Sequence, residues 1–168
     1  MVRSKTNGFT LIELMITVSL CALVLTLTLV NVYFLNRGIV RSEVDKLYSA
    51  CMYLQQRALT SNTQQELVFN QEQNSYSYAG RAEKVRAPVT FGVIPHVKGP
   101  PSSPSKIVKF PITFKKGKIL FYPDGIISSG TVYLSDSKKQ FLYALSSGVG
   151  SVSHLRMYRY SGKWELLT

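Results

Sequence analysis

The chain has 168 residues, a length typical of one globular domain with a modest hydrophobic core. Its 20 Lys and Arg residues outnumber its 9 Asp and Glu residues, and the resulting formal net charge of +11 favours an acidic partner. Cys21 and Cys51 would lie about 45 Å apart on one helix, which excludes a disulfide between them within one subunit.

An apolar run near the N-terminus is long enough to cross a lipid bilayer. No charged side chain occurs from Leu14 to Leu35, and about 22 helical residues extend roughly 33 Å. Arg3 and Lys5 precede the run, and the positive-inside rule keeps such a segment on the cytoplasmic face. We therefore expect a single-pass membrane anchor with a cytoplasmic N-terminus and a C-terminal part outside the cytoplasm.

A single carboxylate, Glu13, stands at the beginning of this run. A carboxylate inside a membrane helix costs about 2.5 to 3.5 kcal/mol on insertion scales, so it usually has a partner and a function. The simpler interpretation is that Glu13 reaches the headgroups, because it lies only a few residues inside the membrane edge. Glu13 is therefore a candidate functional residue.

The stretch from Gly8 to Glu13 resembles the class III signal of type IV prepilins and pseudopilins. The shared features are a short basic leader, a glycine, a hydrophobic first mature residue, a glutamate at the fifth mature position and an uninterrupted apolar helix. The resemblance implies that a prepilin peptidase cuts between Gly8 and Phe9 and methylates the new amine of Phe9. It also implies that this amine pairs with Glu13 of a neighbouring subunit, or of its own, and so sets the register. An ordinary N-terminal membrane anchor is the other interpretation.

The helix is predicted to continue past the apolar run. Apolar residues recur there at alternating spacings of four and three, which is typical of an amphipathic helix: Val40, Val44, Leu47, Cys51, Leu54 and Ala58. Gly38 marks a boundary or slight bend, and a polar cluster from Thr60 to Thr63 ends the helix. The expected organisation is a leader over residues 1–8, a membrane and polymerisation helix over 9–36, an amphipathic half over 37–62 and a β-rich periplasmic domain over 63–168.

The remainder is predicted to form an antiparallel β-sheet. Eight short segments rich in β-branched and aromatic residues are separated by turn signals: Glu66–Phe69, Tyr76–Tyr78, Val89–Ile94, Ile107–Phe114, Lys118–Tyr122, Thr131–Leu134, Phe141–Ser146 and His154–Tyr160. Lys116-Gly117 is a hairpin candidate, and Pro123-Asp124-Gly125 is a turn. The fold class is α+β, and the resemblance implies a type IV pilin-like arrangement with the long helix packed on the C-terminal sheet domain.

A second resemblance concerns the C-terminal half. Residues 119–125 followed by 129–134 are similar to the C-terminal pattern of the GspH/FimT group of minor pseudopilins and pilins, although any strand, Pro-Asp-Gly turn and strand would look alike. Many major pilins close a C-terminal loop with a disulfide, and the lack of a cysteine after Cys51 favours a minor subunit. The implied partners are prepilin peptidase, other major and minor pseudopilins or pilins, the inner-membrane assembly platform and membrane lipid.

Two groups of basic residues are candidates for binding DNA. Lys115, Lys116 and Lys118 cluster at the predicted hairpin, while Arg156, Arg159 and Lys163 alternate with aromatic residues near the C-terminus. Such cations neutralise phosphates, and aromatic rings offer stacking faces. Arg156 and Arg159, however, are three apart and point to opposite faces of a strand, so a single patch needs a turn or twist. Solvated surface residues are the simpler interpretation.

No enzymatic site, metal site or cofactor is expected. His96 and His154 are isolated, and Asp124 and Asp136 alone do not supply the oxygens that calcium prefers. Gly148-Val149-Gly150-Ser151 is better explained as a turn than as a dinucleotide-binding loop. We therefore expect an assembly subunit, namely a minor pseudopilin of a type II secretion pseudopilus. The alternatives are a FimT-like minor type IV pilin in pilus priming or DNA uptake, and a simple anchored periplasmic domain.

Overall fold

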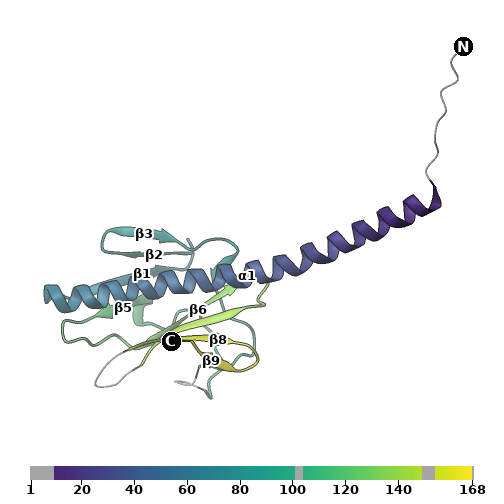
Figure 1. Ribbon diagram of the computed structural model, residues 1–168. Helices are drawn as coiled ribbons and strands as arrows, with labels where there is room; N and C mark the ends of the chain where they lie inside the picture. Colours follow the sequence, from purple (N-terminus) through teal and green to yellow (C-terminus); the bar gives the residue numbers. More distant parts are fainter. Residues whose placement is uncertain (1–9, 101–103, 149–153, 168) are drawn as a thin grey trace, which may run out of the picture. The chain divides into compact units, whose positions relative to one another are not determined.

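The computed structural model describes residues 10–100, 104–148 and 154–167, without the side chains of residues 27–36. The chain forms two compact units, Met1–Leu35 and Asn36–Thr168, and helix α1 (Leu11–Ser61) contributes to both. Figure 1 shows the elements in chain order. Within the described residues, no helix has both the length and the apolar character that crossing a membrane requires. The predicted leader, Gly8 and Phe9, and the side chains of residues 27–35 of the apolar run lie outside the described part.

The second half of α1 packs through the apolar seam that the sequence predicts. All six seam residues are fully buried: Val40, Val44, Leu47, Cys51, Leu54 and Ala58. Burial also raises the pKa of the Cys51 thiol, which keeps this cysteine protonated inside the core. The helix ends at Ser61, inside the predicted polar cluster, where Asn62 adopts a positive φ of 51°. The buried seam and the helix end at Ser61 agree with the sequence pattern, while the division of the helix at residues 36 and 37 and the bend at Gly38 stay predictions.

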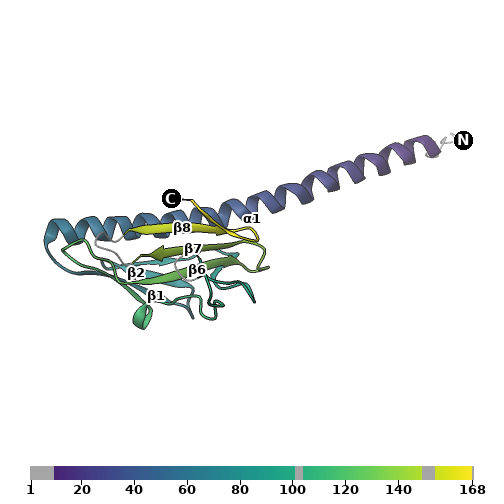
Figure 2. The same ribbon diagram turned by 90° about the horizontal axis from the view of Figure 1, so that it is seen from below.

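The described strands form two antiparallel sheets, whereas the sequence analysis predicted one. The first sheet has the order β3–β2–β1–β5, built from Arg81–Lys84, Ser75–Tyr78, Gln65–Asn70 and Lys118–Phe121. The second has the order β4–β6–β7–β8–β9, built from Val89–Phe91, Gly130–Asp136, Leu142–Ser147, Leu155–Tyr160 and Trp164–Leu166. Strands β6, β7 and β8 lie side by side in Figure 2. The predicted α+β fold class is confirmed.

The second sheet is buried on both faces. One face packs in the main core together with α1 and the first sheet, through residues such as Val132, Leu145 and Met157. The opposite face carries a smaller cluster of Val97, Tyr133, Leu142, Ala144 and Tyr158, which the segment around Val93 and Val108 and the ring of Trp164 cover. Every residue of β7 is buried in consequence.

One predicted strand is wrong and two strands were missed. Ile107–Phe114 is not a strand: it makes only the isolated bridges Lys98↔Ile107 and Ile112↔Val132, because Pro111 interrupts it and has no N–H to donate to a ladder. Its buried apolar side chains divide between the two clusters: Val108 covers the second cluster, whereas Ile112 and Phe114 pack in the main core. Strand β3 has four exposed residues and no alternating apolar pattern, and strand β9 has only three residues, too few for an alternating pattern to be recognised. The short 3-10 helix η1 (Lys115–Gly117) precedes β5, and the Pro123-Asp124-Gly125 turn is confirmed, with Gly125 at φ 85°.

Candidate functional site

The side chains of Thr10 and Glu13 form a closed hydrogen-bonded pair at the beginning of α1. The backbone N–H of Thr10 donates to Oε2 of Glu13 at 2.8 Å, and the Thr10 hydroxyl donates to the same oxygen at 2.9 Å. The backbone N–H of Glu13 donates to Oγ1 of Thr10 at 3.3 Å. Because α1 begins at Leu11, Thr10 is the N-cap and Glu13 the third helical residue. The arrangement is a capping box, which satisfies backbone donors that the helix itself leaves free.

The capping box is a role for Glu13 that the sequence analysis missed. The signal was present in the spacing Thr-x-x-Glu directly before an apolar run. Phe9, whose amine is the predicted partner of Glu13, precedes Thr10 directly and lies outside the described residues. The described geometry therefore gives Glu13 a partner within its own chain, while its pairing with an N-terminal amine stays a prediction.

The polar side chains of the first helical turns are satisfied within the helix. The hydroxyls of Thr17, Ser19 and Thr26 each donate to a backbone carbonyl three or four residues earlier. The oxygen–oxygen distances are 2.8 to 2.9 Å. The apolar side chains around them are exposed, from Leu11 at 78 % to Leu25 at 62 %. A helix surface with exposed apolar groups and internally bonded hydroxyls is suited to lipid or to packing against other helices.

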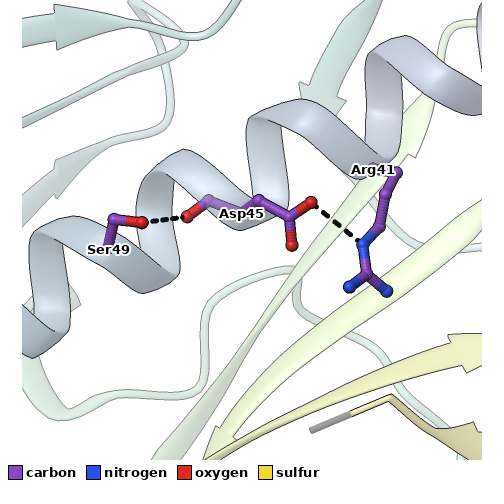
Figure 3. A network of polar contacts seen from close by, with 3 residues as sticks. All are labelled: Arg41, Asp45 and Ser49. Carbon is purple, nitrogen blue, oxygen red and sulfur yellow. Dashed lines mark hydrogen bonds and ion pairs between the residues drawn. The ribbon is translucent and has the colours of Figure 1, made fainter.

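A polar groove runs along the second half of α1 beside β2 and β3. Figure 3 shows its helical wall, where Nε of Arg41 donates to Oδ2 of Asp45 at 3.0 Å and the Ser49 hydroxyl donates to the Asp45 carbonyl at 2.9 Å. The groove has a volume of about 760 Å³, and Tyr76, Tyr78 and Glu83 line its other side. Its charges are of both signs, so it does not select an anion or a cation by charge alone.

The tyrosines of this groove are structural. The rings of Tyr76 and Tyr78 stack with centroids 6.1 Å apart, and Tyr53 of α1 meets Tyr78 edge to face at 6.4 Å. Burial, reinforced by the negative charge of Glu83, raises the pKa of the Tyr76 hydroxyl, so it stays protonated at neutral pH. These contacts fix the β2–β3 hairpin on the helix and provide neither an activated nucleophile nor a general base.

The first group of candidate DNA-binding residues lies at η1 and the beginning of β5. Lys115 and Lys116 are exposed in η1, where Lys116 has a positive φ of 56°. Lys118 is half-buried, and its Nζ pairs with Oε2 of Glu66 at 3.1 Å. The predicted hairpin is absent here because Ile107–Phe114 is not a strand. Among the described residues, Lys115 and Lys116 therefore have no ion-pair partner.

The second group is spread over both faces and both ends of the β8–β9 hairpin. Arg156 is exposed, contacts Nε2 of His154 at 3.3 Å, and pairs in register with Ser146. Arg159 lies on the opposite face of β8, as the alternation predicted, and forms an ion pair with Glu165. Lys163 is exposed beyond Tyr160, at the far end of the strand from Arg156. The structure thus does not gather Arg156, Arg159 and Lys163 into one patch, and their role in DNA binding stays a prediction.

No metal centre is formed by the part of the chain that the structure describes. There, no three His, Cys, Asp or Glu side chains come close enough together to hold an ion. Asp136 is buried and its carboxylate accepts backbone N–H groups of Lys138, Gln140 and Phe141. Its oxygens therefore stabilise the turn after β6.

A long N-terminal helix with a Thr10–Glu13 capping box, an exposed apolar first half and a second half packed on antiparallel sheets defines a type IV pilin-like subunit. Two family models match the chain: the prokaryotic N-terminal methylation motif over residues 3–29, and the type II transport protein GspH over residues 43–149. The chain belongs to the GspH family of type II transport proteins, which are structural subunits and not enzymes. Comparisons with the curated proteins and with the solved structures found no match.

The family membership confirms the resemblances drawn from both ends of the sequence. The chain is a type II secretion minor pseudopilin or a pilin-like protein, and its methylation motif is that of membrane-anchored pseudopilins. Subunits of this kind are processed by prepilin peptidase and assemble with other pseudopilins or pilins.

Proposed function

We propose that the chain is a minor pseudopilin of a type II secretion pseudopilus. Residues 9–36 hold it in the inner membrane, with the leader cytoplasmic and the β-rich domain of residues 63–168 in the periplasm. Prepilin peptidase cuts between Gly8 and Phe9, the amine of Phe9 is methylated, and the subunit is assembled into a short filament through the inner-membrane platform. The observation that carries this proposal is the joint match to the methylation motif and to GspH, which together cover both ends of α1.

The surface of the first helical turns supports membrane anchoring. Large apolar side chains from Leu11 to Leu25 are half to three-quarters exposed, which is unfavourable in water. Lipid covers them before assembly, and neighbouring helices cover them in the filament. The hydroxyls of Thr17, Ser19 and Thr26 add little cost in either environment, because each already donates to its own helix.

Glu13 supplies the specific step in this mechanism. Before assembly its Oε2 is held by the N–H and the hydroxyl of Thr10. During assembly the amine of Phe9 from a neighbouring subunit pairs with this carboxylate, and the pairing sets the register of the two helices. A compensated pair in the apolar filament core is far less costly than a single buried charge, so a misplaced neighbour is disfavoured.

A replacement of Glu13 tests this function in cells. We expect Glu13→Leu to be inserted and cleaved normally, because the apolar run and the cutting site are unchanged, while its incorporation into the filament falls at least tenfold. Thr10→Val is the matched control: it removes the capping hydroxyl but keeps the carboxylate, and it should be incorporated. Mass spectrometry of the N-terminus and cross-linking to the major pseudopilin provide the two measurements.

Two outcomes of this experiment contradict the proposal. Normal incorporation of Glu13→Leu would remove the register role of the carboxylate. An N-terminus still at Met1 in the membrane fraction would show that no cleavage occurs, and the chain would then be an ordinary anchored domain rather than a processed subunit.

A FimT-like minor type IV pilin is the second candidate, in pilus priming or DNA uptake. It shares the N-terminal design, and the exposed cations Lys115, Lys116 and Arg156 favour it because they can contact phosphate. A salt-dependent mobility shift of duplex DNA by the detergent-solubilised full chain would support it. The shift should then weaken in a variant carrying Lys115→Ala, Lys116→Ala and Arg156→Ala, and its absence in the native chain would contradict DNA binding.

A further inference from the structure

Four exposed cations gather where two chain turns meet in the second unit. Lys84 is the last residue of β3 and Arg86 lies in the connection from β3 to β4, while Lys138 and Lys139 lie in the turn from β6 to β7. The β4–β6 ladder joins the two turns, since Val89 pairs with Asp136 and the N–H of Ser137 donates to the carbonyl of Pro88 at 2.9 Å. Within the described residues none of the four has an ion-pair partner. We call these four residues the basic end.

The carboxylates near the basic end do not neutralise its outer surface. Asp136 is 2 % exposed and its oxygens accept three backbone N–H groups. Glu43 is 4 % exposed and pairs with Nζ of Lys46 at 2.7 Å. Glu83 and Lys84 are consecutive residues of β3, so their side chains point to opposite faces of the strand. Glu83 accordingly lines the groove beside α1, and Lys84 lines a different hollow. Glu72 and Glu83 are exposed, and the four cations outnumber these two carboxylates, so the net charge of this part of the surface is positive.

The hollow at the basic end combines apolar walls with a cationic rim. It has a volume of about 680 Å³, its walls include Val85, Ala87 and Pro88, and Lys84 and Arg86 supply its cations. A phospholipid headgroup has the complementary composition, because a phosphate is followed directly by glycerol and acyl carbons. A free inorganic anion would use only the rim.

The basic end lies close to the point where α1 enters the second unit. The backbone N–H of Arg86 donates to Oε2 of Glu43 at 3.3 Å, which fixes the β3–β4 connection to α1. Glu43 follows Leu35, the last residue of the apolar run, by eight residues, or about 12 Å of helix.

We propose that the basic end binds anionic phospholipid headgroups of the membrane in which α1 is anchored. This inference rests on the proposed function, because it takes residues 9–36 as the anchor. The anchor holds the basic end at a high effective concentration beside the lipid surface, so weak individual contacts suffice. Duplex DNA has no such advantage, since the same anionic headgroups repel it. The contact would hold the periplasmic domain against the membrane until assembly extracts the subunit.

Lysine modification in lipid nanodiscs tests the proposal on the full chain. The chain is reconstituted in discs of phosphatidylcholine alone and in discs with 30 % phosphatidylglycerol, and acetylation rates of single lysines are followed by mass spectrometry. We expect Lys84, Lys138 and Lys139 to react about fivefold more slowly in the anionic discs, with the difference lost at high salt. Lys115 and Lys116 are internal controls, because the Phe114 ring beside them packs on Gly130, six residues along β6 from Asp136 and roughly 20 Å away.

A matched pair of variants separates a local contact from a general charge effect. Lys138→Gln with Lys139→Gln should abolish most of the protection of Lys84, whereas Lys115→Gln with Lys116→Gln removes the same charge and should leave that protection unchanged. Equal rates in the two disc types would overturn the proposal. Protection of the basic end by added duplex DNA in neutral discs, without protection by phosphatidylglycerol, would overturn it in favour of a nucleic-acid surface.

The failure of the proposed function gives a different result. If the chain does not co-purify with either disc, membrane anchoring itself fails and both proposals fall. If it inserts but its basic end reacts equally in both disc types, only the lipid-binding inference is overturned.

Discussion

The side-chain amide of Asn74 donates a hydrogen bond to the carbonyl oxygen of Val89 at 2.7 Å, and Oδ1 of the same amide accepts the N–H of Phe91 at 3.1 Å. Asn74 lies in the turn between β1 and β2 of the first sheet, whereas Val89 and Phe91 belong to β4 of the second. One side chain thus joins the two sheets through both of its polar atoms. Its φ of 48° is one that Asn tolerates better than most residues.

Replacing Asn74 by Ala should therefore lower the free energy of unfolding. The change leaves two backbone groups of β4 without these partners, and we expect a loss of about 1 to 3 kcal/mol. Gln73→Ala is the control in the same turn, since Gln73 is exposed, and it should change stability by less than about 0.5 kcal/mol. Urea unfolding of the micelle-bound chain, followed by the fluorescence of its single tryptophan, measures both. Equal midpoints for the two variants would contradict the joining role of Asn74.

Gly130 is required by close packing at the beginning of β6. A Cβ atom there would lie 2.6 Å from Cγ of Phe114, whose ring is buried and stacks with Phe69 at 6.2 Å. Gly130→Ala should destabilise the second unit by about 1 to 3 kcal/mol, because the ring must move within a filled core. A Cβ at Gly148 would meet no atom of the described residues within 4 Å, so Gly148→Ala should be neutral. The same urea titration applies, and a neutral Gly130→Ala would show that the ring moves at no cost.

The β8–β9 hairpin should lose stability in acid. Hydrogen bonds from Ser161 and Arg159 hold the pKa of the Glu165 carboxyl below its ordinary value. A carboxyl with a lowered folded-state pKa adds stability above the unfolded-state pKa of about 4.3, and loses it as the pH falls through the folded-state pKa. Glu165→Gln should therefore flatten the fall of the melting temperature below about pH 4.3, whereas Glu72→Gln, at an exposed turn, should keep the slope. A wild-type slope in Glu165→Gln would contradict the assignment.

The helix could be predicted from the sequence because its signals are local. The seam from Val40 to Ala58 repeats with the helical period, and each of its residues proved to be fully buried. Strand β3 could not be predicted, because its residues are all exposed and only the pairing with β2 makes them a strand. The apolar stretch around Val108 misled in the opposite direction, since it covers the second cluster as a loop rather than joining a sheet.

The candidate sites also differ in how far a local sequence pattern predicts them. The spacing of Thr10 and Glu13 is local, so the capping box could have been predicted from Thr-x-x-Glu. The alternation of Arg156 and Arg159 was predicted, but their distance from Lys163 depends on where β8 ends. The basic end joins Lys84 and Arg86 to Lys138 and Lys139 through the β4–β6 ladder, and no local pattern predicts which strands become neighbours.

The capping box of Thr10 and Glu13 also has a thermodynamic consequence for assembly. Before assembly the Glu13 carboxylate accepts hydrogen bonds from Thr10 of its own chain. On the proposed function it pairs after assembly with an amine of another chain, so the free energy gained is only the difference between these two states. Because the carboxylate is already hydrogen-bonded before assembly, each step gains less free energy than it would from an unpaired carboxylate, and so it reverses more readily. A subunit that has entered out of register can therefore leave again, and error correction at the filament end follows from the same two residues that begin the helix.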